Sequence, residues 1–213
     1  MRLFAAITVP PEATAEIEAA VAPLRPTWPG MSWADFGHWH LTLTFLGEVT
    51  ATLVPELAAG LGSAAREHPA AVLSVRGAGA FPGPASGRVL WAGVHAQTGA
   101  GQAALAALAA AVADAARRAG APPADEGRSY RPHLTLARCC EPLDVTPLVS
   151  TLAGFAGSAW TARRMQLLSS RPGRRPRYQA LGTWPLLAEI PAVNHRSRIV
   201  PSVGGDASVP GVG

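Results

Sequence analysis

The pattern of apolar and polar positions along the chain predicts an alternation of strands and helices. Residues 2–9 form an apolar run that predicts a buried first strand, and Pro10 and Pro11 then begin a helix that reaches about Leu24. Leucine or valine recurs at helical spacing over residues 50–66 and 102–119, where we expect two further helices. A short helix is expected over residues 144–152. Strands are predicted over residues 31–36, 38–47, 71–83, 87–96, 132–139, 160–168 and 178–186.

Two neighbouring strands follow most of the predicted helices. This order is typical of antiparallel sheets whose outer faces are covered by helices, so we predict an α+β fold. The globular pattern covers residues 1–187 and predicts one domain. Residues 188–213 are rich in Gly, Pro, Ser and Val without periodicity, which predicts a flexible tail that contains His195.

Composition agrees with a folded domain. Of the 213 residues, 48% are hydrophobic and 15% are charged. No apolar run reaches the ~18 residues of a membrane span, and the first strand is followed by prolines rather than by a cleavage site. We therefore expect a cytoplasmic protein that does not enter a membrane.

The charge and the cysteine content exclude few classes of substrate or site. All 18 basic residues are arginine, and the net charge is +4, so an anionic substrate is permitted, whether RNA, nucleotide or acidic protein. Cys139 and Cys140 are adjacent, which disfavours a disulfide between them and falls short of a zinc site. We expect them to pack at the end of a strand.

The tetrapeptide His-Leu-Thr-Leu occurs twice, beginning at His40 and at His133. Strand side chains alternate between faces, so His40 shares a face with Thr42, and His133 with Thr135. The same alternation places Thr44 beside His40 and Thr42, and it places behind the two faces Leu41, Leu43, Phe45, Leu134 and Leu136. The repeated context indicates an internal duplication, which would bring both pairs to one groove about a pseudo-twofold axis.

Two imidazoles across one groove suit displacement at phosphorus. One takes a proton from the attacking oxygen and the other gives a proton to the leaving oxygen, while threonine hydroxyls hold the phosphate. Either histidine alone would favour a structural role, because a single histidine on a strand is usually structural. The chain contains no HExxH, carboxylate cluster or Cys/His ligand set, so no metal site is predicted.

These residues carry a resemblance to a known family. "HLTLTFLGEV" and "RPHLTLAR" resemble the paired His-x-Thr motifs of the two-histidine phosphoesterase superfamily, and more closely its RNA 2′,3′-cyclic phosphodiesterase branch, also called the 2′-5′ RNA ligases. "RLFAAITVP", "GAFPGPASGRVLWAGV" and "RPRYQALGTWPL" resemble the opening strand, central hairpin and closing strand of that family. The resemblance covers residues 1–187.

The resemblance implies a bilobal fold with two antiparallel sheets, outer helices and a groove between the lobes. It implies opening of a terminal 2′,3′-cyclic phosphate on RNA to a 2′-phosphate, without metal or nucleotide cofactor, and 2′-5′ ligation as a second activity. His133 would activate water and His40 would protonate the ribose 3′-oxygen, or the two roles would be exchanged. Thr42 and Thr135 would bind the phosphate. Because one chain supplies the groove, we expect a monomer.

Further residues around the motifs have weaker predictions. Arg131 shares the parity of His133, so it is either a substrate contact or a solvated charge, whereas Arg138 has the opposite parity. The basic segment over residues 169–178 predicts either an RNA-binding loop or a soluble turn. Phe81 is a candidate for stacking on a base, and Trp39 is predicted to lie in the core.

Two other functions stay open at this point. The same chemistry could act on small cyclic nucleotides or on ADP-ribose cyclic phosphate, which the KM ratio between oligonucleotide and mononucleotide would distinguish. A non-catalytic module that binds RNA ends is the alternative from another class. Two complete motifs argue against it, since binding alone does not need two acid–base groups.

Overall fold

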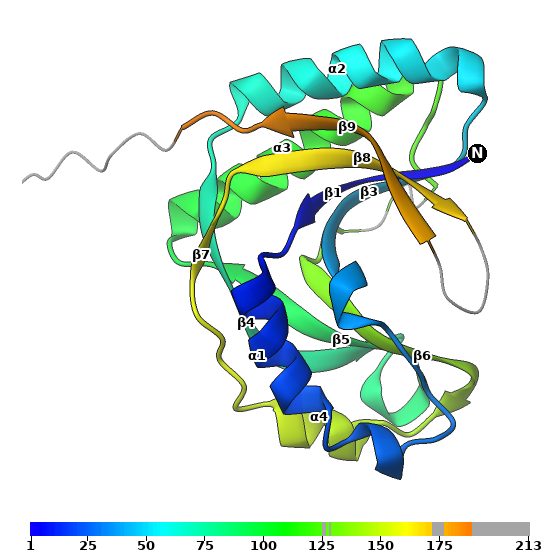
Figure 1. Cartoon of the computed structure of the whole chain (residues 1–213), viewed down its shortest axis with the longest axis vertical. Coiled ribbons are helices and arrows are strands. Elements are labelled where there is room, and N and C mark those ends of the chain that lie inside the picture. Colours follow the sequence, from blue (N-terminus) through cyan, green and yellow to red (C-terminus); the bar gives the residue numbers. More distant parts are fainter. Residues whose placement is uncertain (125–126, 128, 172–176, 189–213) are drawn as a thin grey trace, which may run out of the picture.

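Two antiparallel sheets, one in each lobe, face each other across the molecule (Figure 1). The structure is a computed structural model, and it describes residues 1–124, 127, 129–171 and 177–188. The predicted tail lies outside the described residues except for Ala188, and so does the middle of the basic segment 169–178. The described ends of that segment belong to strands rather than to a loop.

The sheet of the upper lobe has the strand order β3-β1-β8-β9. Its members are β1 (Arg2–Thr8), β3 (His40–Glu48), β8 (Arg164–Arg171) and β9 (Arg177–Pro185). Two long helices, α2 (Val54–Glu67) and α3 (Gly99–Arg118), cover the outer face of this sheet (Figure 1). The short turn η3 (Ala51–Leu53) leads into α2.

The sheet of the lower lobe has the strand order β2-β6-β5-β4-β7. Its members are β2 (Ser32–Trp33), β4 (Ala71–Phe81), β5 (Gly87–Ala96), β6 (His133–Leu143) and β7 (Trp160–Ala162). The helices of this lobe are α1 (Pro11–Val21) and α4 (Thr146–Leu152), and its short turns are η1 (Arg25–Thr27), η2 (Phe36–His38) and η4 (Pro84–Ser86). The predicted α+β class and bilobal arrangement are confirmed.

The segment 160–168 differs from its prediction as one strand. It forms two strands, β7 and β8, which belong to different sheets and are separated by Arg163 alone. The chain thus crosses from the lower lobe to the upper lobe within one residue. The predicted strand 31–36 is also shorter, because β2 ends at Trp33 and η2 follows.

The core helix α3 carries the buried stripe that its spacing predicts. Leu105, Leu108 and Val112 are buried, and Thr98 caps the helix by accepting a hydrogen bond from the backbone N–H of Gly101 at 3.0 Å. By length and composition α3 could cross a membrane, contrary to the expectation from the apolar runs. Its buried face, however, packs against α2 and β3, as in the core helix of a globular domain.

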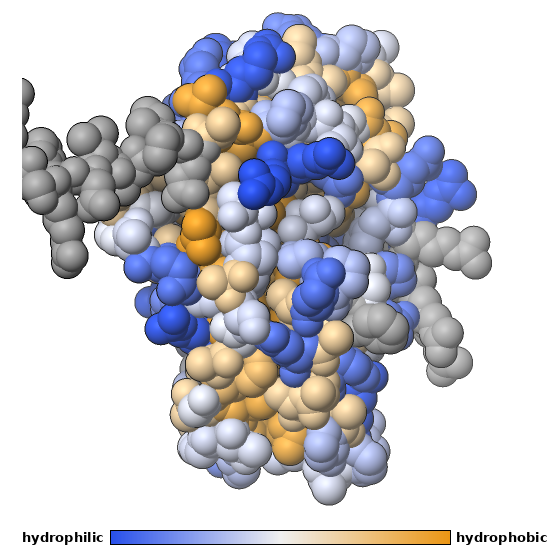
Figure 2. All heavy atoms as spheres, turned by 60° about the vertical axis from the view of Figure 1, so that its left-hand side comes forward, coloured by the Kyte–Doolittle hydropathy of each residue, from blue (hydrophilic) through white to orange (hydrophobic). Residues whose placement is uncertain are grey.

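Many of the exposed positions on the helices are alanine. The helix α1 exposes Ala15 and Ala19, for example, while Ile17 and Val21 are buried. Figure 2 shows the side of the molecule that lies to the left in Figure 1, where apolar side chains gather over the lower lobe among hydrophilic ones. Small exposed apolar residues of this kind are ordinary for a globular surface.

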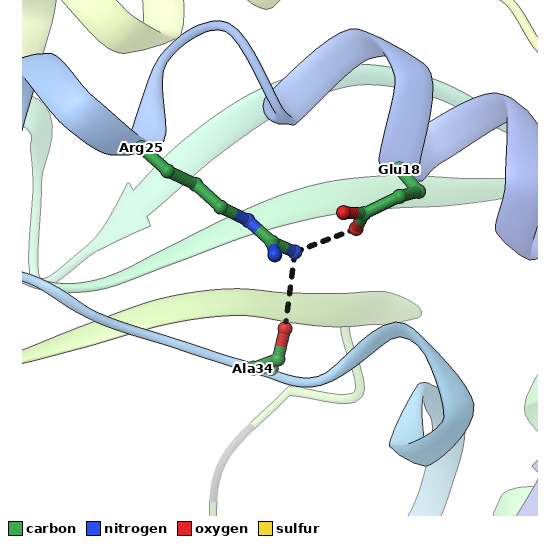
Figure 3. A network of polar contacts seen from close by, with 3 residues as sticks. All are labelled: Glu18, Arg25 and Ala34. Carbon is green, nitrogen blue, oxygen red and sulfur yellow. Dashed lines mark hydrogen bonds and ion pairs between the residues drawn. The ribbon is translucent and has the colours of Figure 1, made fainter.

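A polar network ties α1 to the segment that leads into the first motif. The Arg25 guanidinium donates from Nη2 to Glu18 Oε2 at 2.6 Å and to the carbonyl oxygen of Ala34 at 3.4 Å (Figure 3). The backbone N–H of Ala34 donates in turn to the carbonyl oxygen of Leu136 at 2.9 Å, in the second motif. The approach to β3 is thereby attached to β6.

Candidate active site

The two motif histidines have the same backbone contact. Nδ1 of His40 donates to the carbonyl oxygen of His38 at 2.8 Å, and Nδ1 of His133 donates to that of Arg131 at 2.6 Å. A carbonyl oxygen only accepts, so these partners assign the proton of each neutral imidazole to Nδ1. The lone pair of each Nε2 is then free, on the side of the ring away from this backbone.

Aromatic rings flank both imidazoles. The centroid of the His40 ring lies 4.7 Å from that of Phe4 and 5.2 Å from that of Tyr178. The His133 ring lies 5.1 Å from Phe81 and 6.1 Å from Trp91. Each lobe thus supplies two aromatic side chains that restrict the orientation of its histidine. Phe81 therefore lies at the site, with its ring at an interplanar angle of 81° to that of His133, and Trp39 lies in the core as predicted.

Both histidines have lowered pKa values. Burial lowers the pKa of His40 to about 4, the hydrogen bond to His38 opposes this, and the charges of Arg138, His133 and His38 lower it further. Burial also lowers the pKa of His133, again against its hydrogen bond to Arg131 and with a contribution from Arg138. The strands that carry them, β3 and β6, contact each other across the two sheets. Both pKa shifts favour the neutral form of the imidazole.

A β-bulge interrupts each motif strand at the same position. Along β3, Thr42 pairs with Ala6 and Thr44 with Ala5, so Leu43 between them is an extra residue. Along β6, Thr135 pairs with Trp91 and Ala137 with Leu90, so Leu136 is extra in the same way. The equivalent bulges extend the internal duplication from the sequence to the backbone.

The first bulge corrects the predicted placement of Thr44. Strand alternation predicts Thr44 beside His40, but its side chain is buried behind the strand, with Oγ1 3.5 Å from the carbonyl oxygen of Ala109. Phe45 is exposed instead of buried, with its ring 5.9 Å from that of Phe4. The extra residue Leu43 reverses the alternation at Thr44 and Phe45.

The second bulge corrects the predicted orientation of Arg138. Alternation from His133 predicts the opposite face, but the extra residue Leu136 returns Arg138 to the face that carries His133 and Thr135. Its charge accordingly lowers the pKa of both histidines and opposes the rise that burial causes in the pKa of Tyr178. Arg138 is therefore a site residue that sequence reasoning missed. Strand alternation alone places Arg138 on the wrong face, because the sequence carries no signal for the bulge at Leu136.

The other candidate residues occupy places consistent with the motif pattern. Thr42 and Thr135 precede their bulges, are half-buried, and share the faces of His40 and His133. The side chain of Arg131 is exposed, while its carbonyl oxygen holds His133. Within the described part of the chain, no group of three or more His, Cys, Asp or Glu side chains is placed to hold a metal ion.

Known proteins share sequence with this chain. The model of the 2′-5′ RNA ligase superfamily matches residues 9–174. An RNA 2′,3′-cyclic phosphodiesterase from Thermotoga maritima is 36% identical over 95 residues, which are 45% of this chain and 51% of that protein. The alignments with three curated relatives of this name span between 51% and 65% of their lengths.

Solved structures share the fold over nearly the whole described domain. The protein TT0787 of Thermus thermophilus superposes with a TM-score of 0.71 at 26% identity, covering 89% of this chain and 100% of that one. E. coli LigT complexed with 3′-AMP superposes with a TM-score of 0.66 at 29% identity, covering 87% of this chain and 96% of that one. The bilobal arrangement is thus common to these proteins.

Proposed function

Because the chain belongs to the 2′-5′ RNA ligase superfamily, we propose that it opens the terminal 2′,3′-cyclic phosphate of RNA to a 2′-phosphate. The observation that carries the proposal is the matched pair His40 and His133, each held through Nδ1 by a carbonyl oxygen two residues earlier. The curated relatives named RNA 2′,3′-cyclic phosphodiesterase support the substrate class. The complex of E. coli LigT with 3′-AMP supports a nucleotide as the bound group.

The proposed reaction is an in-line displacement at phosphorus. A water oxygen bonds to the phosphorus, while one imidazole takes the water proton on Nε2. The bond between phosphorus and the ribose 3′-oxygen breaks, and the other imidazole gives its Nε2 proton to that oxygen. The products are a 2′-phosphate and a 3′-hydroxyl, and exchange with solvent returns both imidazoles to their starting states.

The pKa values favour one assignment of the two roles. Burial lowers the pKa of His40 to about 4, and the hydrogen bond of His40 to its carbonyl partner is partly buried while that of His133 is exposed, so His40 suits the base. The negative charge of a bound phosphate favours protonation of a nearby imidazole, and His133 gains that proton first. We assign the base to His40 and the acid to His133, the reverse of the assignment that the motif resemblance favours.

Three further side chains would bind the phosphate. Thr42 and Thr135 would donate hydroxyl hydrogen bonds to its non-bridging oxygens, since each lies two residues beyond a motif histidine on the same face. Arg138 would neutralise the negative charge that develops on the phosphate, since its own charge already lowers the pKa of both histidines. If an RNA 5′-hydroxyl attacks the cyclic phosphate in place of water, the same bond to the ribose 3′-oxygen breaks, and the product is the 2′-5′ linkage after which the superfamily is named.

Turnover of an RNA that ends in 2′,3′-cyclic phosphate tests the proposal. We expect the wild-type chain, with EDTA present, to release a 2′-phosphate end. His40→Ala and His133→Ala should each lower kcat by at least ~10²-fold, as for removal of a general acid or base. Circular dichroism spectra and unfolding curves of the variants show that they fold.

The outcome separates catalysis from binding. Retention of the cyclic phosphate by wild type, with tight binding but no product, would indicate a module that only binds RNA ends. Wild-type turnover that both alanine variants match would assign the chemistry to other residues. Size-exclusion chromatography with light scattering tests whether the active species is a monomer, as expected when one chain supplies both histidines.

A further inference from the structure

A pocket lies at the strands β4 and β5 of the lower sheet, beyond the motif residues. It has a volume of about 360 Å³ and is lined by Arg76, His95, Ala96 and Gln97. None of these residues belongs to the two motifs, and none has a role in the reaction proposed above. The position of the pocket relative to His133 indicates a use.

The strand register places this pocket in line with His133. His133 on β6 pairs with Gly93 on β5, and Gly93 pairs with Arg76 on β4. Directly opposed residues of antiparallel strands project to the same face, so Arg76 and His133 share the groove side. Two strand spacings separate their backbones, which is roughly 10 Å.

Gly93, which lies between them in the register, leaves room for the ring of His95. A Cβ added at Gly93 would meet Nε2 of His95 at 2.8 Å, so the His95 ring lies over this glycine. The ring thereby leans from its own position on β5 towards the row that contains His133. A substrate that reaches from His133 to Arg76 would therefore pass the His95 ring.

Neighbouring polar groups hold the guanidinium of Arg76 in place. Its Nε donates to Ser74 Oγ at 3.1 Å, and its Nη2 donates to Gln97 Oε1 at 3.4 Å. Gln97 Nε2 donates to the same Ser74 Oγ at 2.8 Å, and Ser74 is fully buried. Among the described residues no carboxylate forms an ion pair with Arg76, and its remaining N–H groups are available to a ligand.

We propose that Arg76 and His95 bind a second phosphate of the substrate, the one on the 5′-oxygen of the nucleoside that carries the cyclic phosphate. In RNA this is the phosphodiester to the preceding nucleotide. A guanidinium with free N–H donors beside an imidazole is suited to phosphate oxygens. The inference rests on the proposed function, because the cyclic phosphate must first lie at His40 and His133.

Three substrates of increasing length test this subsite. They are cytidine 2′,3′-cyclic phosphate, its 5′-phosphorylated form, and the dinucleotide CpC with a 2′,3′-cyclic phosphate end. We expect wild type to prefer the two that carry a second phosphate by about tenfold or more in kcat/KM. Arg76→Gln should reduce that preference by about the same factor, mainly through KM, and His95→Gln should reduce it less.

Arg66→Gln is the matched control. Arg66 lies on the outer helix α2 and bonds to Ser63, so this variant removes one positive charge at a distance from the groove. It should keep the wild-type preference. Loss of one phosphate contact should also reduce the slope of log kcat/KM against log salt concentration by about 0.7 in Arg76→Gln. A general charge effect would change Arg76→Gln and Arg66→Gln equally and would overturn the inference.

The design separates this inference from the proposed function. If wild type turns over all three substrates and neither Arg76→Gln nor His95→Gln changes the preference, only the subsite is wrong. An equal loss on every substrate would place Arg76 at the cyclic phosphate and would also overturn the subsite. If wild type turns over none of them, the proposed function fails and this inference fails with it.

Discussion

Arg138 lies close enough to His40 for its positive charge to lower the pKa of that imidazole, although the two residues belong to different sheets. The same guanidinium lowers the pKa of His133 on its own strand. A fixed positive charge that acts on two neutral imidazoles makes their common site suitable for an anion. Protonation of either ring is unfavourable until an anion lies there.

Removal of this charge should raise the pKa of both histidines. In Arg138→Gln we expect NMR titration of the imidazole Cε1–H signals to give higher pKa values for His40 and His133 than in wild type, because a repulsive positive charge is lost. Turnover of cyclic-phosphate RNA should fall by about tenfold to hundredfold, since a charged hydrogen bond to phosphate is lost. Unchanged titrations would show that Arg138 lies farther from the imidazoles than the structure places it, and Arg66→Gln serves as the control.

The bulge at Leu43 predicts opposite results for two threonines of one strand. Thr42→Val removes a hydroxyl from the face of His40 and should lower kcat by at least about tenfold if that hydroxyl stabilises the phosphate. Thr44→Val removes a hydroxyl that is buried behind the strand and should keep nearly wild-type activity. The valine side chain has a similar shape in both variants. Similar losses in the two would contradict the bulge.

Much of the fold follows from periodicity in the sequence. The spacing of Leu105, Leu108 and Val112 predicts the buried stripe of α3, and the repeated His-Leu-Thr-Leu predicts two equivalent strands. The pairing of His40 with His133 in one site also follows from the repeat. In each case a regular element maintains its period over the residues concerned, so local patterning and tertiary packing agree.

The remaining features depend on single residues where the period breaks. Leu43 and Leu136 are ordinary strand residues, and nothing marks them as bulged, so the faces of Thr44 and Arg138 are predicted wrongly. Arg163 separates β7 from β8 without a glycine or proline, so the crossing between sheets has no local signal. The subsite at Arg76 likewise depends on the register across three strands, which alternation within one strand does not specify.

The buried imidazole of His40 should make the stability of the protein depend on pH. Its pKa is about 4 in the folded chain, against 6.5 as its ordinary value. Between these values the unfolded chain binds a proton that the folded chain does not, so the free energy of unfolding rises with pH from 4 to 6.5. As pH falls through this window, we expect a loss of roughly 2–3 kcal/mol from His40 alone.

Urea unfolding of wild type and His40→Gln at pH 7 and pH 4.5 measures this contribution. The glutamine variant lacks the titrating ring, so it should lose roughly 2–3 kcal/mol less than wild type between the two pH values. The difference between the proteins at pH 7 gives the effect of the substitution on packing and is subtracted. Equal pH dependence in both would mean that the His40 ring titrates alike in the folded and unfolded chains.

The contact between Trp91 and Gly79 should control the surroundings of His133. A Cβ at Gly79 would collide with the Trp91 ring, which lies over this glycine and next to His133. Gly79→Ala should therefore displace the ring and destabilise the protein by about 1–3 kcal/mol, as for overpacking of a filled site. Because a displaced ring covers His133 less, the pKa of that imidazole should rise. Gly83→Ala is the control, because it adds the same methyl group where no atom lies within 4 Å. Urea unfolding should give this variant a free energy of unfolding within about 0.5 kcal/mol of wild type, and NMR titration should give it an unchanged His133 pKa. Equal behaviour of the two variants would show that the Trp91 ring does not depend on the space above Gly79.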